Sequence, residues 1–344
     1  MAQSVQGFSF RGTTGVVRPN DVPIAAGYLT SNPDRAVARA ENPDFTPWIG
    51  LGIGRQFERW HVSADLGFAG HTLGTDNQSL QQFSGEMKLR LAIPSTIDGS
   101  NALVRSVTLT PNPINRTDGS RIATRSERTF SAQRLDLTAE RIWERGDIAI
   151  TTKFGAFYAN EDAAQLVGIL GTALQTAIFD GFRVEATQIS SIARNDRRMG
   201  VSAGLRADWR VTDPVQLSFS GGISGVHAGT DIVFEQLTSV TTTQTSTDGT
   251  ILNQPFIPRV VDANAAYITG GHSYSGFAVH GNIEFAVGLV GPNGEILELF
   301  IARTWQGETP TVFVPATASD PDFGFSQESL AIDMAGIRLR IPYN

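Results

Sequence analysis

His61 and Ser63 are the residue pair in this sequence with the clearest potential for chemistry. Side chains alternate across a β-strand, so residues two apart lie on one face. His61 could therefore take the hydroxyl proton of Ser63 while a carboxylate on a neighbouring strand orients the imidazole, as in a hydrolase. The adjacent Trp60 and Val62 are apolar and occupy the opposite face. An ordinary polar pair is the simpler interpretation, and we predict no catalytic residue.

His280, Asn282 and Glu284 form a second polar row. A metal site on this row would need converging ligands from other strands. The chain contains 5 His and no Cys, so such ligands are scarce and thiolate chemistry is excluded. Asp-Gly pairs at 98–99, 118–119 and 248–249 could bind Ca²⁺ weakly, but they fit plain turns better than a calcium loop. We therefore predict neither a metal nor a cofactor.

The elements that carry these residues are predicted by an alternation of period two. Apolar residues take every second position of 60–68, and similar runs recur at 83–93, 148–158, 199–209 and 277–287. Such runs exceed the roughly 5–6 residues of an average strand and match the about 9–11 residues that cross a bilayer at a tilt. The pattern predicts about twelve strands. They are expected at 6–17, 46–57, 60–71, 80–93, 101–111, 130–143, 147–159, 198–211, 214–228, 271–287, 294–305 and 328–341.

Connections between these strands alternate in length. Short turns are predicted at 58–59, 144–147, 212–214 and 291–294, and long loops at 18–45, 112–129, 160–197, 229–270 and 306–327. Short turns at one end and long loops at the other are typical of outer-membrane barrels. Within one long loop, Leu166, Leu170, Leu174 and Ile178 repeat every four residues. This spacing predicts a short amphipathic helix over 163–179 that either narrows the pore mouth or packs on neighbouring loops.

Composition narrows the class of protein. The 344 residues are 41% hydrophobic and 18% charged, which indicates a folded chain. A net charge of -7 argues against nonspecific binding of nucleic acid, which needs a basic surface. No run approaches the roughly 18 consecutive apolar residues of a membrane helix. The first residues lack a basic segment followed by an apolar one, so we expect a mature chain without a signal peptide.

The tryptophans predict where a membrane would lie. Amphipathic rings settle at the headgroup level, near both ends of transmembrane strands. All 5 Trp fall near predicted strand ends. The expected aromatic girdle is Trp48, Trp60, Trp143, Trp209 and Trp305. Together these patterns predict an all-β fold: one transmembrane antiparallel up-and-down β-barrel over 1–344, with long extracellular loops and one loop helix.

In such a barrel the apolar phase faces lipid and the polar phase faces the lumen. The predicted lining is Asp65, Glu86, Lys88, Arg90, Arg134, Asp136, Glu140, Lys153, Arg206, Asp208, His280 and Glu284, with Glu298, Arg338 and Arg340 in the same phase. Carboxylates and cations balance in this set, which predicts weak selectivity between ions. In the last predicted strand, Ile332 and Met334 are out of phase with the apolar residues at 337–341. A bulge near Gly336 would reconcile the two phases.

Two hairpins resemble a known family of barrels. The first runs from Arg134 to Arg141 and from Gly146 to Tyr158, and the second covers 198–209 and 216–225. Both are similar to hairpins of the pore-forming barrels typified by the Legionella-type major outer membrane protein. The resemblance covers these two hairpins and implies an outer-membrane pore with extracellular loops and no catalytic residues. The chain departs from many such barrels because it does not end on an aromatic residue.

These observations predict a porin-like channel of the bacterial outer membrane, through which small hydrophilic solutes and ions diffuse passively. The alternative is a structural surface barrel with a plugged lumen, whose extracellular loops make lattice or adhesive contacts. A lipid hydrolase that uses His61 and Ser63 is a weaker hypothesis, because the pair faces away from lipid. Expected partners are outer-membrane lipid, lipopolysaccharide and small hydrophilic solutes, but not nucleic acid. Homo-oligomer formation is left open.

Overall fold

The computed structural model describes residues 7–18, 25–29, 32–39, 45–75, 81–83, 87–94, 102–109, 120–176, 180–247, 258–313 and 324–343. Nearly all of them lie in β-strands, as the alternating pattern predicts. The strands are β1 (Phe8–Arg18), β2 (Ala25–Leu29), β3 (Asn32–Arg39), β4 (Thr46–Phe57), β5 (Trp60–Thr75), β6 (Gln81–Phe83), β7 (Met87–Pro94), β8 (Ala102–Leu109), β9 (Ser120–Arg145), β10 (Ile148–Thr176), β11 (Asp180–Thr212), β12 (Val215–Thr247), β13 (Arg259–Val290), β14 (Ile296–Phe313) and β15 (Gly324–Tyr343).

The main sheet closes into a ring. It contains 11 strands, of which the short β6 pairs only with β9, so ten strands form the ring itself. Their order is β10-β11-β12-β13-β14-β15-β1-β4-β5-β9, and the antiparallel pairing of β9 with β10 completes the circle. A closed ring satisfies its backbone hydrogen bonds without an exposed edge, which a hydrocarbon environment requires. The predicted all-β antiparallel barrel is confirmed.

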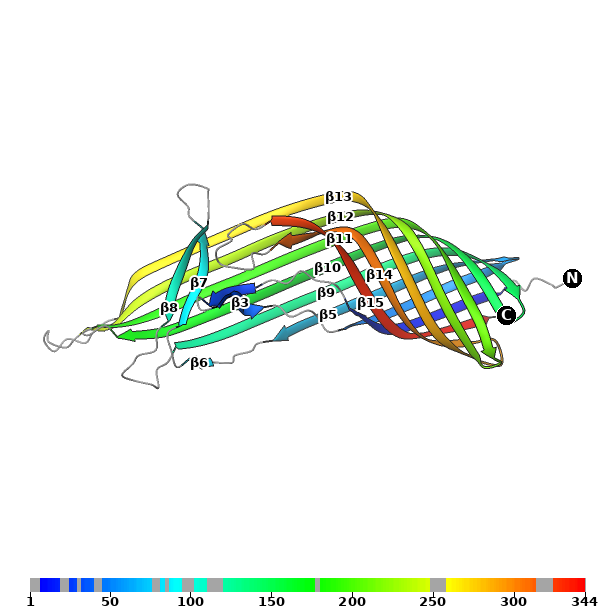
Figure 1. Cartoon of the computed structure of the whole chain (residues 1–344), viewed down its shortest axis with the longest axis horizontal. Coiled ribbons are helices and arrows are strands. Elements are labelled where there is room, and N and C mark those ends of the chain that lie inside the picture. Colours follow the sequence, from blue (N-terminus) through cyan, green and yellow to red (C-terminus); the bar gives the residue numbers. More distant parts are fainter. Residues whose placement is uncertain are drawn as a thin grey trace.

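The two ends of the barrel differ. Both chain termini lie at one end, and β9 to β13 extend far beyond the ring at the other (Figure 1). The terminal end carries the predicted short turns between β4 and β5, β9 and β10, β11 and β12, and β13 and β14. Gly146 and Gly294 take φ values of 61° and 86° in two of these turns. Glycine adopts positive φ without the steric cost that a Cβ imposes, so these tight reversals need it.

The outer surface of the ring is apolar. Leu51 is 67% exposed on β4, Val201 is 66% exposed on β11, and Phe277 is 73% exposed on β13. Every other ring strand presents large apolar side chains in the same way. Because water would not tolerate so large an apolar surface, lipid must cover it. The protein is therefore a transmembrane β-barrel of the bacterial outer membrane, as the sequence predicts.

The predicted number of strands is wrong, because 80–93 and 101–111 do not join the ring. Within these ranges the short β6 pairs with β9 in the main sheet, and β7 and β8 belong to a second antiparallel sheet of order β3-β2-β7-β8. This sheet packs against the extended parts of β9 to β13. Alternation predicts that a segment forms a strand, but it does not specify which strand becomes its partner.

The predicted helix over 163–179 is also wrong, because β10 continues as a strand to Thr176. Leu166 and Leu170 are four residues apart, and four is a multiple of the strand period as well as close to a helical turn. β10 pairs on both sides over this segment, with Glu127 and Ser191 opposite Leu166. The ranges 160–197 and 229–270, predicted to be loops, are likewise mostly strands that lengthen the barrel wall.

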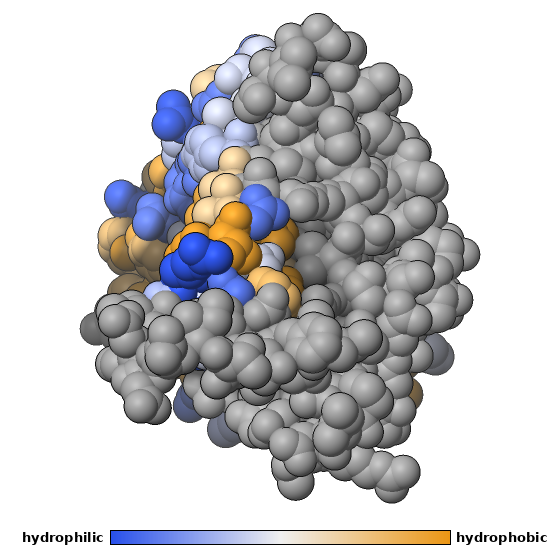
Figure 2. Space-filling model, turned by 90° about the vertical axis from the view of Figure 1, so that its left-hand side faces the viewer, coloured by the Kyte–Doolittle hydropathy of each residue, from blue (hydrophilic) through white to orange (hydrophobic). Residues whose placement is uncertain are grey.

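The strand extensions have a buried inner face and a mixed outer face. Val167, Ile232 and Phe234 are at most 3% exposed on the inner face, where the second sheet lies. On the outer face Val233 and Leu237 alternate with charged residues of β12. Figure 2 looks onto this end of the molecule, and its coloured surface mixes hydrophilic and hydrophobic patches. Such a surface differs from the continuous apolar band of the ring.

Candidate functional site in the barrel lumen

The inward face of the ring strands carries most of the predicted lumen residues. Their apolar neighbours in the sequence point outward, and alternation directs the polar phase inward. The side chains that the structure places in the lumen are Asp65, Arg134, Asp136, Glu140, Lys153, Arg206, Asp208, His280 and Glu284. They come from β5, β9, β10, β11 and β13, so the site is assembled from strands far apart in the sequence.

Three predicted lumen residues lie elsewhere or outside the description. Lys88 and Arg90 lie on β7, which is part of the second sheet and not of the ring. The prediction that a barrel strand carries them into the lumen is therefore wrong. Glu86 lies outside the described residues.

A network of ion pairs lies in the lumen at one level, on the wall from β11 to β15. We call Arg206, Glu284, Glu298, Arg338 and Arg340 the lumen floor. Glu298 on β14 is fully buried and contacts the guanidinium groups of all three arginines, including Arg338 at 3.3 Å. Arg338 on β15 also donates two hydrogen bonds to the carboxylate of Glu284 on β13, at 2.8 and 2.7 Å.

The lumen floor continues into polar residues of β11 and β12. Arg206 donates to Asp208 at 2.8 Å and to the hydroxyl of Ser218 at 2.9 Å. Burying a charge is costly unless an opposite charge and hydrogen bonds compensate it, and here Arg206, Arg338 and Glu298 each contact more than one opposite charge. A ten-stranded barrel is only slightly wider than the eight-stranded kind that side chains fill. The lumen floor therefore occupies part of the lumen at this level.

A second group of charges lies on the opposite wall, from β1 to β10. Arg11 pairs with Asp65 at 3.2 Å. Glu140 accepts from the ammonium of Lys153 at 3.0 Å, and its other oxygen lies 3.7 Å from His61 Nδ1. Arg11, Asp65, Glu140 and Lys153 line the same cavity as Arg206, Glu284 and Arg338, so the two walls form one polar layer.

The serine that contacts His61 is not the predicted one. His61 Nε2 lies 2.8 Å from the hydroxyl of Ser9 on β1, two strands away in the ring. Ser63 instead donates to Asp65 at 3.3 Å. Spacing within one strand predicts which residues share a face, but the partner is decided by the register between strands, which the sequence does not reveal.

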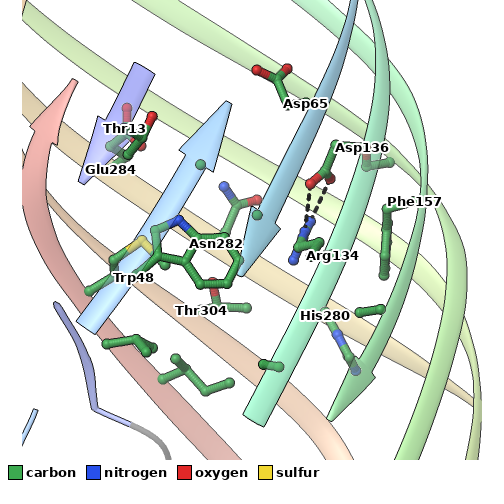
Figure 3. Close-up of a pocket in the computed structure, with 18 of the residues that line it drawn as sticks. Thr13, Trp48, Asp65, Arg134, Asp136, Phe157, His280, Asn282, Glu284 and Thr304 are labelled. Atoms are coloured by element: carbon green, nitrogen blue, oxygen red, sulfur yellow. Dashed lines mark hydrogen bonds and ion pairs between the residues drawn. The ribbon is translucent and has the colours of Figure 1, made fainter. Parts of the chain in front are cut away.

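A cavity of about 420 Å³ borders this polar layer. Asp65, Glu140 and Glu284 line it beside the charges just described, and Asn282 and Thr304 contribute uncharged polar groups. Figure 3 shows Trp48 of β4 and Asn282 and Glu284 of β13 directed into this space. Its volume lies within the range of small-molecule sites, which is about 300–1,000 Å³.

A cluster of apolar side chains also borders the cavity. We call this set the apolar collar: Val17, Trp48, Ala69, Phe130, Ala132, Ala163, Ile332 and Met334. The predicted bulge near Gly336 is absent, because β15 keeps an unbroken register with β1 from 333 to 343. Ile332 and Met334 are out of phase with the lipid-facing residues because they face the lumen. The phase change in the sequence therefore indicates the apolar collar, and its interpretation as a bulge is wrong.

Further charges lie beside the cavity, in pairs. Arg134 donates to both oxygens of Asp136 at 2.8 Å, and its guanidinium stacks 4.7 Å from the ring centre of Phe157. Arg198 pairs with Glu161 at 2.7 Å and with Asp196 at 3.1 Å. These pairs leave little net charge, so the cavity presents both polar and apolar groups to a ligand.

Four of the five predicted girdle tryptophans point outward. Trp60, Trp143, Trp209 and Trp305 are 38%, 50%, 52% and 43% exposed. Trp48 is different, because it shares the inward face of β4 with Gly50 and lines the cavity. Its place in the girdle was predicted from its position near a strand end, without regard to the phase of the alternation.

Within the residues that the structure describes, there is no helix long and apolar enough to span a membrane. Within the same ranges, no group of three or more His, Asp and Glu side chains is placed to hold a metal ion.

Comparison with known proteins gives structural neighbours but no relatives. No protein-family model matches the sequence, and no curated protein does. The outer membrane protease OmpT from Escherichia coli is 9% identical with a TM-score of 0.48, covering 100% of this chain and 99% of its own. The toluene transporter TodX of P. putida is 10% identical with a TM-score of 0.23, covering 98% and 89%. OmpT of Vibrio cholerae is 10% identical with a TM-score of 0.18, covering 100% of both chains.

Proposed function

We propose that this outer-membrane barrel is a channel for small hydrophilic solutes and ions, which the lumen floor closes in the conformation described here. The observation that carries the proposal is the ion-pair network around Glu298, directly beside a cavity of about 420 Å³. The passive diffusion predicted from the sequence is thereby replaced by gated diffusion, since the floor must rearrange before a solute passes.

The chemistry of the lumen floor supports a gate over a permanent plug. Arg206 touches Glu298 and lies 3.9 Å from Glu284, and Arg338 contacts both carboxylates. Arg206 and Arg338 therefore each have a second carboxylate within reach and can exchange partners without becoming unpaired. A rearrangement that keeps every buried charge paired avoids the large penalty for an isolated buried ion.

The open channel is expected to discriminate weakly between ions. Arg206, Arg338 and Arg340 face Asp208, Glu284 and Glu298, so cations and carboxylates balance at the narrowest level. A ring of one sign would produce strong selectivity, whereas a balanced ring does not.

Planar-bilayer recording tests the proposal. The wild-type protein should give rare, discrete openings, and Glu298→Gln should open often, because three arginines then lose their shared carboxylate. The reversal potential of Glu298→Gln in a salt gradient should shift toward anions. Glu295→Gln, an exposed carboxylate in the turn between β13 and β14, is the matched control and should behave like wild type. Silence of Glu298→Gln and of Arg338→Gln, in protein that migrates as a folded barrel, would exclude the channel.

The second candidate function is a structural surface barrel with a plugged lumen. The strand extensions favour it, because they place a long two-sided wall with a buried inner face beyond the membrane. Contacts with lipopolysaccharide, with lipid and with other copies of the chain belong to this proposal, as does membership of the family that the two hairpins resemble. Silent floor variants would favour this function, and truncation of the extensions would then abolish surface contacts.

A further inference from the structure

The side chains of Ser9, His61 and Glu140 lie next to one another, with His61 between the other two. This is the arrangement of a nucleophile, a base and a carboxylate. Ser9 Oγ lies 2.8 Å from His61 Nε2, within the range for a nucleophile and its base. The other ring nitrogen, Nδ1, lies 3.7 Å from Glu140 Oε2. The side chains of His61 and Glu140 are only 15% and 10% exposed, so their interaction is partly shielded from water. β1, β5 and β9 supply one residue each.

The backbone leaves space for this arrangement at one position. Gly54 pairs with both Ser9 and Ser63 across neighbouring strands. A Cβ at Gly54 would collide with His61 Nε2 and with Ser9 Oγ. The imidazole and the hydroxyl therefore meet over a glycine, and any larger residue would separate them.

Glu140 is placed between a cation and the imidazole, as a base-orienting carboxylate needs. Its Oε1 accepts from Lys153 at 3.0 Å, which leaves Oε2 free to face the imidazole. A carboxylate on Nδ1 favours the tautomer with the proton on that nitrogen, so that Nε2 is free to accept the hydroxyl proton of Ser9.

A cation lies on the same face of β1 as the nucleophile. Arg11 is two residues from Ser9, and side chains two apart on a strand point the same way. Its terminal nitrogen pairs with Asp65, while its buried Nε has no hydrogen-bond partner among the residues that the structure describes. A donor in this position can stabilise the negative charge that develops on a carbonyl oxygen attacked by Ser9.

We propose that Ser9, His61 and Glu140 form a hydrolytic triad in the lumen, near the end of the barrel that carries the termini, for short-chain esters. Ser9 Oγ forms a bond to the carbonyl carbon while His61 Nε2 takes the hydroxyl proton. The C–O bond to the alcohol breaks, and the alcohol leaves with that proton. Water then attacks the acyl-serine, His61 takes a proton from it and returns one to Ser9, and the acid is released. Ser9 and His61 are catalytic residues, and Glu140 is a positioning residue.

The confined lumen limits the substrate to small molecules, because the lumen floor and the polar layer fill this end of the barrel. Long lipid chains are excluded, since the triad faces the lumen and the apolar band faces lipid. This activity is independent of the proposed channel, because it requires access to Ser9 but no passage through the lumen floor.

The test is covalent labelling of the full-length folded protein with diisopropyl fluorophosphate. Ser9 Oγ would form a bond to phosphorus as fluoride leaves, and His61 would take the hydroxyl proton. Peptide mass mapping should find the label on Ser9. Ser9→Ala should abolish it, and His61→Gln should slow it by about 100-fold or more. Ser63→Ala, two residues from His61 on β5, is the matched control and should be labelled like wild type.

A second measurement uses hydrolysis of p-nitrophenyl acetate. Ser9→Ala should remove turnover, and Glu140→Gln should reduce it. Glu140→Asp should retain part of the turnover that Glu140→Gln loses, because it keeps a carboxylate. A carboxylate with a purely structural role would not produce this difference. Absence of label on Ser9, or equal labelling of native and heat-unfolded protein, would overturn the triad. If His61→Gln fails to migrate as a folded barrel, that comparison of native and unfolded wild type still decides the question.

Discussion

Arg206 on β11 and Glu298 on β14 form an ion pair inside the barrel, although 92 positions separate them in the chain and two strands separate them in the ring. Their side chains are 3% and 0% exposed. The contact therefore reaches past β12 and β13 and joins two strands that backbone hydrogen bonds do not join directly. Its energetic importance lies in what remains when one partner is removed, because a buried ion is left without compensation.

The pair should be coupled in stability. Glu298→Gln and Arg206→Gln should each lower the free energy of unfolding by about 3–5 kcal/mol. The double variant should lose less than the sum of the two, with a coupling of roughly 0.5–3 kcal/mol. Urea unfolding in detergent, followed by tryptophan fluorescence, measures all three. Additive losses would show that the two residues do not depend on each other.

Trp48 should make Gly67 intolerant of a side chain. A Cβ at Gly67 would collide with the indole ring of Trp48, whereas a Cβ at Gly70 meets nothing within 4 Å. The indole ring is rigid and packed in the apolar collar, so Gly67→Ala should lower the free energy of unfolding by about 1–3 kcal/mol through overpacking. Gly70→Ala, three residues along the same strand, is the matched control and should unfold like wild type in urea. Equal stability of the two variants would contradict the lumen position of Trp48.

The architecture could be predicted from the sequence because lipid imposes a strict rule. An outward residue such as Leu51 must be apolar, whereas its inward neighbour Gly52 is not so constrained. The alternation can therefore be recognised in the sequence of every ring strand. The short turns were equally legible, since Gly146 and Gly294 occupy positions that need positive φ.

The lumen was harder to predict because alternation assigns faces but not partners. Alternation places Arg206 and Glu284 in the lumen. The ion pairs that Arg206 makes with Glu298 and Glu284 depend on register and on the tilt of β13 to β15, which alternation does not specify. The contact between Ser9 and His61 has the same origin, because two strands must bring them together. Outside the membrane lipid does not impose the alternation of apolar and polar residues, so the sequence prediction assigned β7 and β8 to the wrong sheet.

Tyr267, on the strand extensions, should ionise at unusually high pH. Its hydroxyl donates to Glu235 Oε1 at 2.9 Å, and this bond to a carboxylate raises the pKa of the phenol above its ordinary value of 10.0. The bond favours the neutral phenol, so its contribution to stability is present below pH 10.0 and is lost as pH rises through the raised pKa. Phenolate absorbance, taken as the difference from Tyr267→Phe, should show a lower pKa in Glu235→Gln. An unchanged curve would contradict the contact.

Removal of β7 and β8 should leave the ring intact. Phe83 on β6 lies opposite Ser120 on β9 in antiparallel register, so a two-residue Asn-Gly turn can replace 84–119. No ring strand is lost, and the variant should still migrate as a heat-modifiable barrel. The inner faces of the extensions, with Val167, Ile232 and Phe234, should become exposed, because the second sheet packs there. Increased binding of a hydrophobic dye and faster proteolysis within 160–197 would report that exposure. A variant that fails to form a barrel in detergent would instead show that 80–93 and 101–111 complete the ring, as the alternation alone predicted.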